Sequence, residues 1–410
     1  SRGLGDVYKR QLFSLESVGC KDWLTNKVDR CVGGKVAKQQ CVGELQLPLN
    51  NCGVMALDFS TRHGVATSIG HSSISALIDP ESGSKNSIAE ALTNIIWAPI
   101  ENNLKGVSLS ANWMWPCRNY GEDARLYKAV DSLSKFAIEL GINIPTGKDS
   151  LSMNQKYEDI EVKSPGTVII SATAHCSDIY NIIEPPLKAN KGSVFYINLS
   201  SDDYKLGGSA FSQIIGNIGV DTPTINDSKY FLNVFDTIQK MIKKKLIISG
   251  HDVGSGGLIT TLMEMCFSTN NIGAKIDLTS LNEKDSVKLL FSENSGIVIQ
   301  CKDKKSEKEI MDSGIRAYRI GEVTNSNNLV IKNHDNDFLF DLDKFRDYWF
   351  STSTLLDKKQ TSNNLADVRF KNYKKQPLKY KFPKNFEGNL IKLTSGKKPI
   401  AAIPVSYTHL

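Results

Sequence analysis

The chain has 410 residues, of which 40% are hydrophobic and 23% charged, with 13 prolines and 8 cysteines. This composition is typical of a globular protein and excludes a disordered, collagen-like or disulfide-scaffold chain. No window approaches about 18 consecutive apolar residues, so the sequence predicts no membrane span, and its first residues show no secretory pattern. No cysteines form a C-x-x-C pair, which favours reduced thiols in a cytoplasmic protein.

The net charge of +6 has one main source in the sequence. Residues 351–386 hold nine Lys or Arg and only two acidic residues, Asp357 and Asp367. This distribution argues against a basic surface that binds nucleic acid and indicates a basic linker, which we place at 351–396. Docking of that segment onto an acidic neighbour is the alternative interpretation.

Both ends differ from the sequence beside them. Residues 1–11 show no periodicity, and residues 405–410 break off an apolar run. We predict both as foreign tails, which makes the chain an internal piece of a longer polypeptide.

Residues 12–182 predict a β-rich subdomain with flanking helices. A helix at 87–97 has Ile88, Leu92 and Ile95 at helical spacing, and a second helix at 122–140 is ended by Gly141. Strands are predicted at 54–59, 64–69, 107–113 and 166–174.

Residues 183–350 predict an α/β subdomain, because strands and helices alternate. A proline-bearing linker at 179–190 precedes it. Strands are predicted at 194–199, 246–249, 274–278, 297–301 and 318–323, and helices at 210–215, 228–244, 258–268 and 341–350.

The strongest chemical signal is the loop after the strand at 246–249. His251 and Asp252 precede three glycines and a helix, so the backbone can approach an anion and Asp252 can hold Mg²⁺ against a phosphate. The alternatives are a tight turn without a ligand and a Ser255 hydrolase, which Val253 disfavours by breaking the G-x-S-x-G pattern. The glycines are Gly254, Gly256 and Gly257.

Two further groups of polar residues stand out. Ser87 and Glu90 have the spacing of a capping box, and Glu90 and Asn94 lie one turn apart, where two oxygens suit a hard cation. The capping box predicts that Glu90→Gln keeps much of the helix stability. Residues 146–153 combine a glycine with charged and hydroxyl side chains, which suits either a phosphate site or a charged turn. Its candidate ligands are Lys148, Asp149, Ser150 and Ser152.

Together these strings resemble one family, the long single-chain phosphoribosylformylglycinamidine synthases of purine biosynthesis. The similarity covers residues 24–405 and includes the Gly-rich loop at His251 and Asp252. The other five strings are LPLNNCGV at 47–54, AEALTN at 89–94, LSANWM at 109–114, GEDA at 121–124 and GKDSLSM at 147–153.

The resemblance implies an α/β (α+β) fold, the second aminoimidazole-ribonucleotide-synthetase-like unit of that enzyme. Residues 397–404 are then the start of a truncated glutamine amidotransferase domain. The implied partners are the remainder of the polypeptide (the first synthetase unit, the N-terminal domain and the amidotransferase domain) and small-molecule substrates, with no nucleic acid and no membrane.

The resemblance also implies Mg²⁺ and ATP or ADP as cofactors. The family's metal ligands map onto Asn51, Glu90, Asn94 and Asp252, and Asn50 maps onto a nucleotide contact. Two positions depart from the family pattern. Asn51 stands where Asp is frequent, and Gly254 stands where a nucleotide-contacting Ser is common.

The implied function is part of an ATP- and glutamine-dependent ligase that converts formylglycinamide ribonucleotide to formylglycinamidine ribonucleotide. The amide oxygen is phosphorylated, and ammonia then displaces phosphate. The chain lacks the amidotransferase nucleophile, so we expect it to be inactive alone. The alternatives are a non-catalytic Mg²⁺-nucleotide lobe of that enzyme and another ATP-dependent enzyme of the superfamily.

Overall fold

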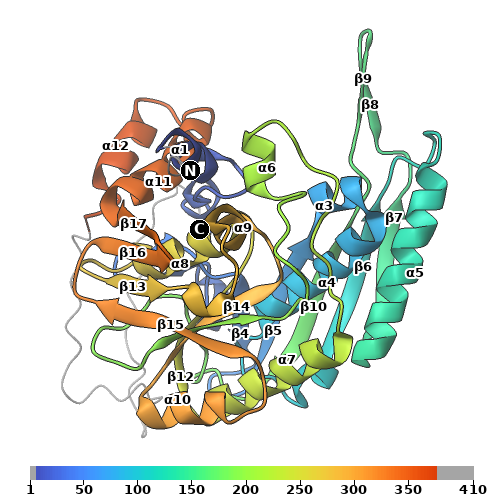
Figure 1. The fold of residues 1–410 in the computed structure, drawn as a ribbon. Helices are drawn as coiled ribbons and strands as arrows, with labels where there is room; N and C mark the ends of the chain where they lie inside the picture. The colour runs from blue at the N-terminus through green and yellow to red at the C-terminus, as the bar shows by residue number, and fades with distance from the viewer. Residues whose placement is uncertain (1–5, 376–410) are drawn as a thin grey trace, which may run out of the picture. The chain divides into compact units, whose positions relative to one another are not determined.

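Two β-sheets and the helices packed on them make up residues 6–375, which the computed structural model describes (Figure 1). The first sheet has six strands in the order β1-β4-β5-β10-β6-β7, and all neighbours are antiparallel except β6 and β7. The strands are β1 Val36–Lys38, β4 Cys52–Ala56, β5 Gly64–His71, β10 Thr167–Cys176, β6 Val107–Met114 and β7 Asn143–Ser150.

The second sheet has seven strands in the order β12-β14-β11-β15-β13-β16-β17. Only β13 and β16 pair in parallel. The strands are β12 Ile247–Asp252, β14 Gly296–Cys301, β11 Val194–Asn198, β15 Ala317–Thr324, β13 Gly273–Asp277, β16 Asn328–Asn333 and β17 Asn336–Asp341. Two short hairpins pair β2 Cys41–Val42 with β3 Leu47–Pro48, and β8 Asn154–Tyr157 with β9 Ile160–Lys163.

The helices accompany these sheets in chain order. Up to residue 140 these are α1 Asp6–Ser14, α2 Asp22–Thr25, α3 Ser73–Ile78, α4 Pro80–Ile95 and α5 Glu122–Leu140. After residue 200 they are α6 Ala210–Ile214, α7 Ser228–Lys243, α8 Gly257–Phe267, α9 Ser286–Phe291, α10 Lys304–Met311, α11 Leu342–Asp357 and α12 Leu365–Asn372. Helix α1 packs against α11 and α6. Short 3₁₀ turns lie at Val32–Gly34, Asn103–Gly106 and Thr279–Leu281.

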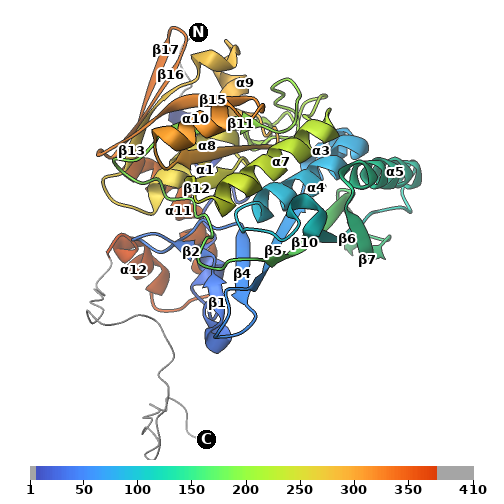
Figure 2. The same cartoon turned by 90° about the horizontal axis from the view of Figure 1, so that it is seen from below.

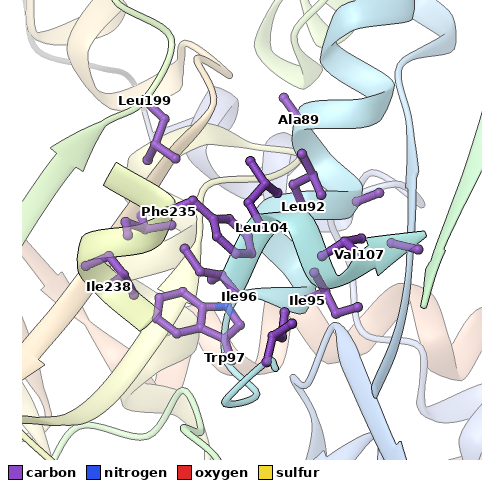
Figure 3. Packing of buried hydrophobic residues seen from close by; sticks show 14 of the residues in the cluster. Ala89, Leu92, Ile95, Ile96, Trp97, Leu104, Val107, Leu199, Phe235 and Ile238 are labelled. Carbon is purple, nitrogen blue, oxygen red and sulfur yellow. The ribbon is translucent and has the colours of Figure 1, made fainter. Parts of the chain in front are cut away.

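Helix α4 joins the two subdomains through one hydrophobic core. It packs on β5 and β10 on one side and reaches α5 and β12 on others (Figure 2). Figure 3 shows Ile96 and Trp97 beside Phe235 and Ile238 of α7, all of them at most 2% exposed. Because apolar side chains from both subdomains share this core, the two subdomains pack firmly against each other.

The start of α4 differs from the sequence prediction. The helix begins at Pro80, capped by Asp79, whose carboxylate accepts from the amides of Glu81 and Ser82. Ser87 therefore lies inside the helix, where its hydroxyl donates to Gly83 O, and the predicted capping box with Glu90 is wrong. Asp before Pro is a good start signal, and the run of Ser and Gly that follows obscured it.

Both predicted segments at the ends of the described region have more structure than expected. Residues 6–11 belong to α1, and residues 351–357 complete α11. Helix α12 follows within the predicted linker, where Tyr373 stacks on Phe350 with ring centroids 4.1 Å apart. The linker prediction is therefore wrong over 351–372, because basic residues there alternate with apolar ones that pack. Residues 1–5 and the predictions for 376–396, 397–404 and 405–410 lie outside the described residues.

The close approach of β5 to α4 gives a stability prediction. A Cβ built on Gly70 would lie 2.3 Å from both the backbone oxygen of Ser87 and the backbone nitrogen of Ala91. We expect Gly70→Ala to lower the free energy of unfolding by about 3 kcal/mol, since backbone atoms cannot yield as side chains do. Gly53→Ala is the control, because its Cβ would meet only ordinary contact at 3.6 Å. Equal midpoints in urea for the two variants would contradict this packing.

Candidate functional site

A cleft of about 940 Å³ lies where β4 and β5 face the loop between β12 and α8. Asn51, just before β4, and Glu90 and Asn94 on α4 line it together with Asp252 at the end of β12. The structure thus brings together all four residues that the family resemblance implied as metal ligands. His251, Gly254 and Asn50 also line it.

Asp252 is held from several directions. Its side chain is 3% exposed, and the Asn51 amide donates to its two carboxylate oxygens at 3.2 and 3.0 Å. Its backbone oxygen accepts from the Thr261 hydroxyl at 3.0 Å. Burial alone would raise the pKa of Asp252, but the neighbouring His251 outweighs it and the pKa is lowered, so the residue is a carboxylate.

The ring of His251 lies between two carboxylates. Its ring is 2% exposed, with Nδ1 3.4 Å from Asp252 and Nε2 2.9 Å from Glu264. Burial lowers the pKa of His251, but the charges and hydrogen bonds of the two carboxylates raise it to about 10. Both ring nitrogens therefore face carboxylates, which leaves neither of them free to act as the base of a Ser255 hydrolase, and a nucleotide contact by His251 stays a prediction.

Glu90 and Asn94 present oxygen atoms that protein groups do not fully satisfy. Glu90 accepts from the His71 amide at 2.5 Å, and loss of water contact raises the pKa of Glu90 to about 8, with a smaller contribution from Asp252. Asn94 is 6% exposed and donates to Ile69 O at 2.8 Å, while its own Oδ1 has no partner among the described residues. A bound cation would satisfy both groups.

The glycines after Asp252 shape the start of α8. Gly256 and Gly257 have φ angles of +90° and +72°, which other residues rarely adopt. The Gly256 amide donates to Glu293 at 2.7 Å, so it is already bound to a carboxylate. Gly254 faces the cleft, where an added Cβ would meet only Asp252, at 3.8 Å.

The predicted phosphate ligands at 146–153 do not join this site within the described chain. They lie on or just after β7, the edge strand of the sheet, whereas Asn51 precedes β4 near the opposite edge. Lys148 is exposed, and its ammonium donates to the Ser150 hydroxyl at 2.7 Å. Asp149 and Ser152 are also exposed. Their role as ligands stays a prediction.

Sequence reasoning missed six charged residues that line the cleft: Glu16, Lys21, Asp29, Arg30, Lys38 and Glu264. Glu264, which contacts His251, is the only charged residue of the largely apolar α8, and that isolation is a usable signal. Lys38 is 4% exposed, and its ammonium donates to Ile183 O at 2.5 Å. Nothing in the local sequence distinguishes Lys38 from a surface lysine, so only the fold reveals it.

Glu293, beside the cleft, gives a pH prediction. It accepts from the amides of Ala210 and Gly256, and burial raises its pKa from 4.5 to about 7. Between those values the folded chain holds a proton that the unfolded chain has released, so the free energy of unfolding falls as pH rises. We expect Glu293→Gln to remove about 3 kcal/mol of this fall. Urea titrations at several pH values from 4.5 to 7.5 measure how the free energy of unfolding depends on pH. The exposed Glu139→Gln is the control and should leave this dependence unchanged. The same unchanged dependence in Glu293→Gln would contradict the prediction.

No group of three or more His, Cys, Asp or Glu in residues 6–375 is placed to hold a metal ion, so any ion in the cleft would also need amide or ligand oxygens. No helix of that region is long and apolar enough to cross a bilayer.

Comparisons with known proteins agree with this architecture. Residues 20–175 match the FGAR-AT PurM_N-like domain, and residues 192–333 match the C-terminal domain of AIR synthase related proteins. Among solved structures, T. maritima PurL complexed with FGAR superposes with a TM-score of 0.62 at 11% identity, over 83% of this chain and 53% of that one. At that identity the likeness shows the fold.

The sequence relatives are closer. A probable phosphoribosylformylglycinamidine synthase of Arabidopsis thaliana, described as chloroplastic/mitochondrial, is 38% identical over 95% of this chain and 27% of its own length. Phosphoribosylformylglycinamidine synthase of Homo sapiens is 36% identical over 76% of this chain and 24% of its own length. The chain thus spans about a quarter of these relatives, and by these matches it belongs to the phosphoribosylformylglycinamidine synthase family.

Proposed function

We propose that the cleft binds a nucleoside di- or triphosphate together with Mg²⁺. The observation that carries this proposal is the pair of acidic side chains, Glu90 and Asp252, that line one cleft while Glu90 has no ion pair within residues 6–375. A carboxylate removed from water without a cation is costly, so the pair favours a positively charged ligand. Carboxylate and amide oxygens are the donors that Mg²⁺ prefers.

The donor set fits this ion. Glu90, Asn94 and Asp252 would hold Mg²⁺, with Asn51 as a further amide donor and phosphate oxygens completing the shell. Bound Mg²⁺ neutralises phosphate charge and aligns the phosphates. The amide nitrogen of Asn51 donates to Asp252, so the side-chain oxygen of Asn51 is the atom left for a cation. Solved structures of T. maritima PurL with ATP, ADP and AMPPCP support nucleotide as the ligand class.

Calorimetry of the 410-residue chain with ADP tests the proposal, in the presence and absence of Mg²⁺. We expect binding that requires Mg²⁺, because the buried carboxylate of Asp252 would otherwise repel the phosphates. Binding of ADP with equal affinity in EDTA would exclude the metal. No heat of binding at millimolar Mg²⁺ and ADP would exclude the nucleotide site itself.

We further propose that the chain is part of a ligase that forms formylglycinamidine ribonucleotide from its amide precursor, ATP and glutamine. The names of the relatives support this activity for the whole protein. In the reaction, ATP phosphorylates the amide oxygen, and ammonia from glutamine displaces phosphate. The rest of the polypeptide is the proposed partner, and the relatives' greater length supports this.

A second candidate is that this unit binds nucleotide for structure only. The hydrogen bonds from Asn51 to Asp252 favour it, since an amide at that position brings one charge fewer to the metal than a carboxylate would. Labelled ADP bound to the full-length protein separates the two candidates. Label that exchanges during turnover supports a catalytic site, whereas label retained through many turnovers supports a structural one.

We propose a reducing compartment, the cytoplasm, as the location. All eight cysteines lie among the described residues, and none forms a disulfide. Free cysteines are typical of reducing compartments.

A further inference from the structure

A chain of hydrogen bonds connects the cleft with α11. Glu264, on α8, lies between two donors: its Oε2 is 2.9 Å from His251 Nε2, and its Oε1 accepts from Trp349 Nε1 at 3.0 Å. His251 in turn is 3.4 Å from the Asp252 carboxylate. The order is therefore Trp349, Glu264, His251 and Asp252, across α11, α8 and β12.

We propose that Glu264 is a positioning residue of the nucleotide site, which fixes the His251 ring and through it the direction of the Asp252 carboxylate. This inference rests on the proposed binding of Mg²⁺ and nucleotide. Glu264 reaches Asp252 only through His251, so its effect is on geometry. Residues that orient metal ligands in this way change metal affinity by roughly ten- to a hundredfold when they are replaced.

The packing around Glu264 supports a fixed geometry. The side chain is 18% exposed, and the other residues of α8 are buried and uncharged. Trp349 is 2% exposed, and its ring packs against Phe267 with centroids 5.4 Å apart. The indole therefore has one orientation, and its N–H holds one carboxylate oxygen while the other faces His251. A carboxylate with each oxygen assigned to a separate partner has little freedom to rotate.

Substitutions at Glu264 distinguish positioning from general stability. Glu264→Leu removes both acceptors and should weaken binding of Mg²⁺ and ADP about tenfold or more. Glu264→Gln should stay within about threefold of wild type, since its oxygen can still accept from Trp349 and its amide keeps the shape of the side chain beside the His251 ring. Recovery by the amide would show that the polar contacts and shape of the side chain matter more than its charge, and the control below tests general stability.

The control is Glu307→Leu, which removes a buried carboxylate on α10, away from the cleft. Glu307 lies on α10, accepts from the Ser193 amide at 2.8 Å and does not line the cleft. We expect its thermal midpoint to fall like that of Glu264→Leu, with unchanged affinity for Mg²⁺ and ADP. Trp349→Phe keeps the ring and removes the indole donor, so it should weaken binding less than Glu264→Leu.

The outcomes separate this inference from the proposed function. If Asp252→Asn loses binding while Glu264→Leu binds like wild type, positioning by Glu264 is overturned and the nucleotide site stands. If Glu264→Gln loses as much as Glu264→Leu, or Glu307→Leu loses as much affinity, the hydrogen-bonding role is also overturned. If the wild-type chain binds no nucleotide, the proposed function itself fails.

Discussion

Asp252→Asn is expected to weaken binding of Mg²⁺ and ADP by on the order of a hundredfold, because it removes a buried charge from the proposed metal site. The change keeps the shape of the side chain, and the single oxygen of the new amide can still accept from Asn51. The fold should survive, since Asn and Asp are nearly isosteric. Calorimetry with ADP at several Mg²⁺ concentrations measures the loss.

Asp285→Asn is the matched control for that experiment. Asp285 caps α9 through the amides of Val287 and Lys288, and Asn caps helices equally well. Its affinity for Mg²⁺ and ADP should equal that of wild type. An Asp252→Asn variant that binds as tightly as this control would remove Asp252 from the metal site.

The opposite change at the neighbouring position extends the test. Asn51→Asp replaces the donor to Asp252 with a second carboxylate, so the metal-free chain should lose stability through repulsion between like charges. Mg²⁺ should then raise the thermal midpoint of Asn51→Asp more than that of wild type. A smaller rise than in wild type would place the metal away from both residues.

Regular elements with clear periodicity and end signals were predictable from the sequence. The helix predicted at 122–140 is α5 Glu122–Leu140, and Gly141 ends it with a φ of +69°. The start of α4 was not, because Ser82, Gly83 and Ser84 are poor helix formers whose positions are fixed by packing. A Cβ on Gly83 would lie 2.6 Å from Ala76, so the small residue serves the contact with α3.

The candidate site was predictable in part. Glu90 and Asn94 were placed on one face by helical spacing, but their proximity to Asp252 came from the family resemblance, since no local pattern measures a distance across about 160 residues of sequence. The role of His251 needed the fold, because its partner Glu264 lies on another element. The residues at 146–153 show the opposite case. They are a dense group of polar side chains in the sequence, but they lie on an edge strand and do not line the cleft.

The second large effect concerns the chain by itself, which we expect to form no product. The described part of the chain leaves one face of the first sheet without a covering helix, and that face also lines the cleft. Along β5 the residues that face α4 are buried, whereas Ile69, on the other face, is 57% exposed. Met55 of β4 is 44% exposed. A sheet face of this kind requires a partner to complete it.

We therefore expect the isolated chain to self-associate through this face. Sedimentation should show dimers or larger species at micromolar concentration, and Ile69→Lys should shift them toward monomer by placing a charge on the face. Tyr127→Lys is the control, because Tyr127 is 74% exposed on α5, away from that face. Strictly monomeric behaviour of the wild-type chain would contradict the pairing.

Activity with ammonium in place of glutamine completes this test, since it bypasses any need for an amidotransferase. We expect no formylglycinamidine ribonucleotide above background from the 410-residue chain, because an active site that depends on a second unit stays open to water when that unit is absent. ADP formation should also stay at background. Turnover by a monomeric chain would mean that the cleft lined by Glu90 and Asp252 is complete without a partner.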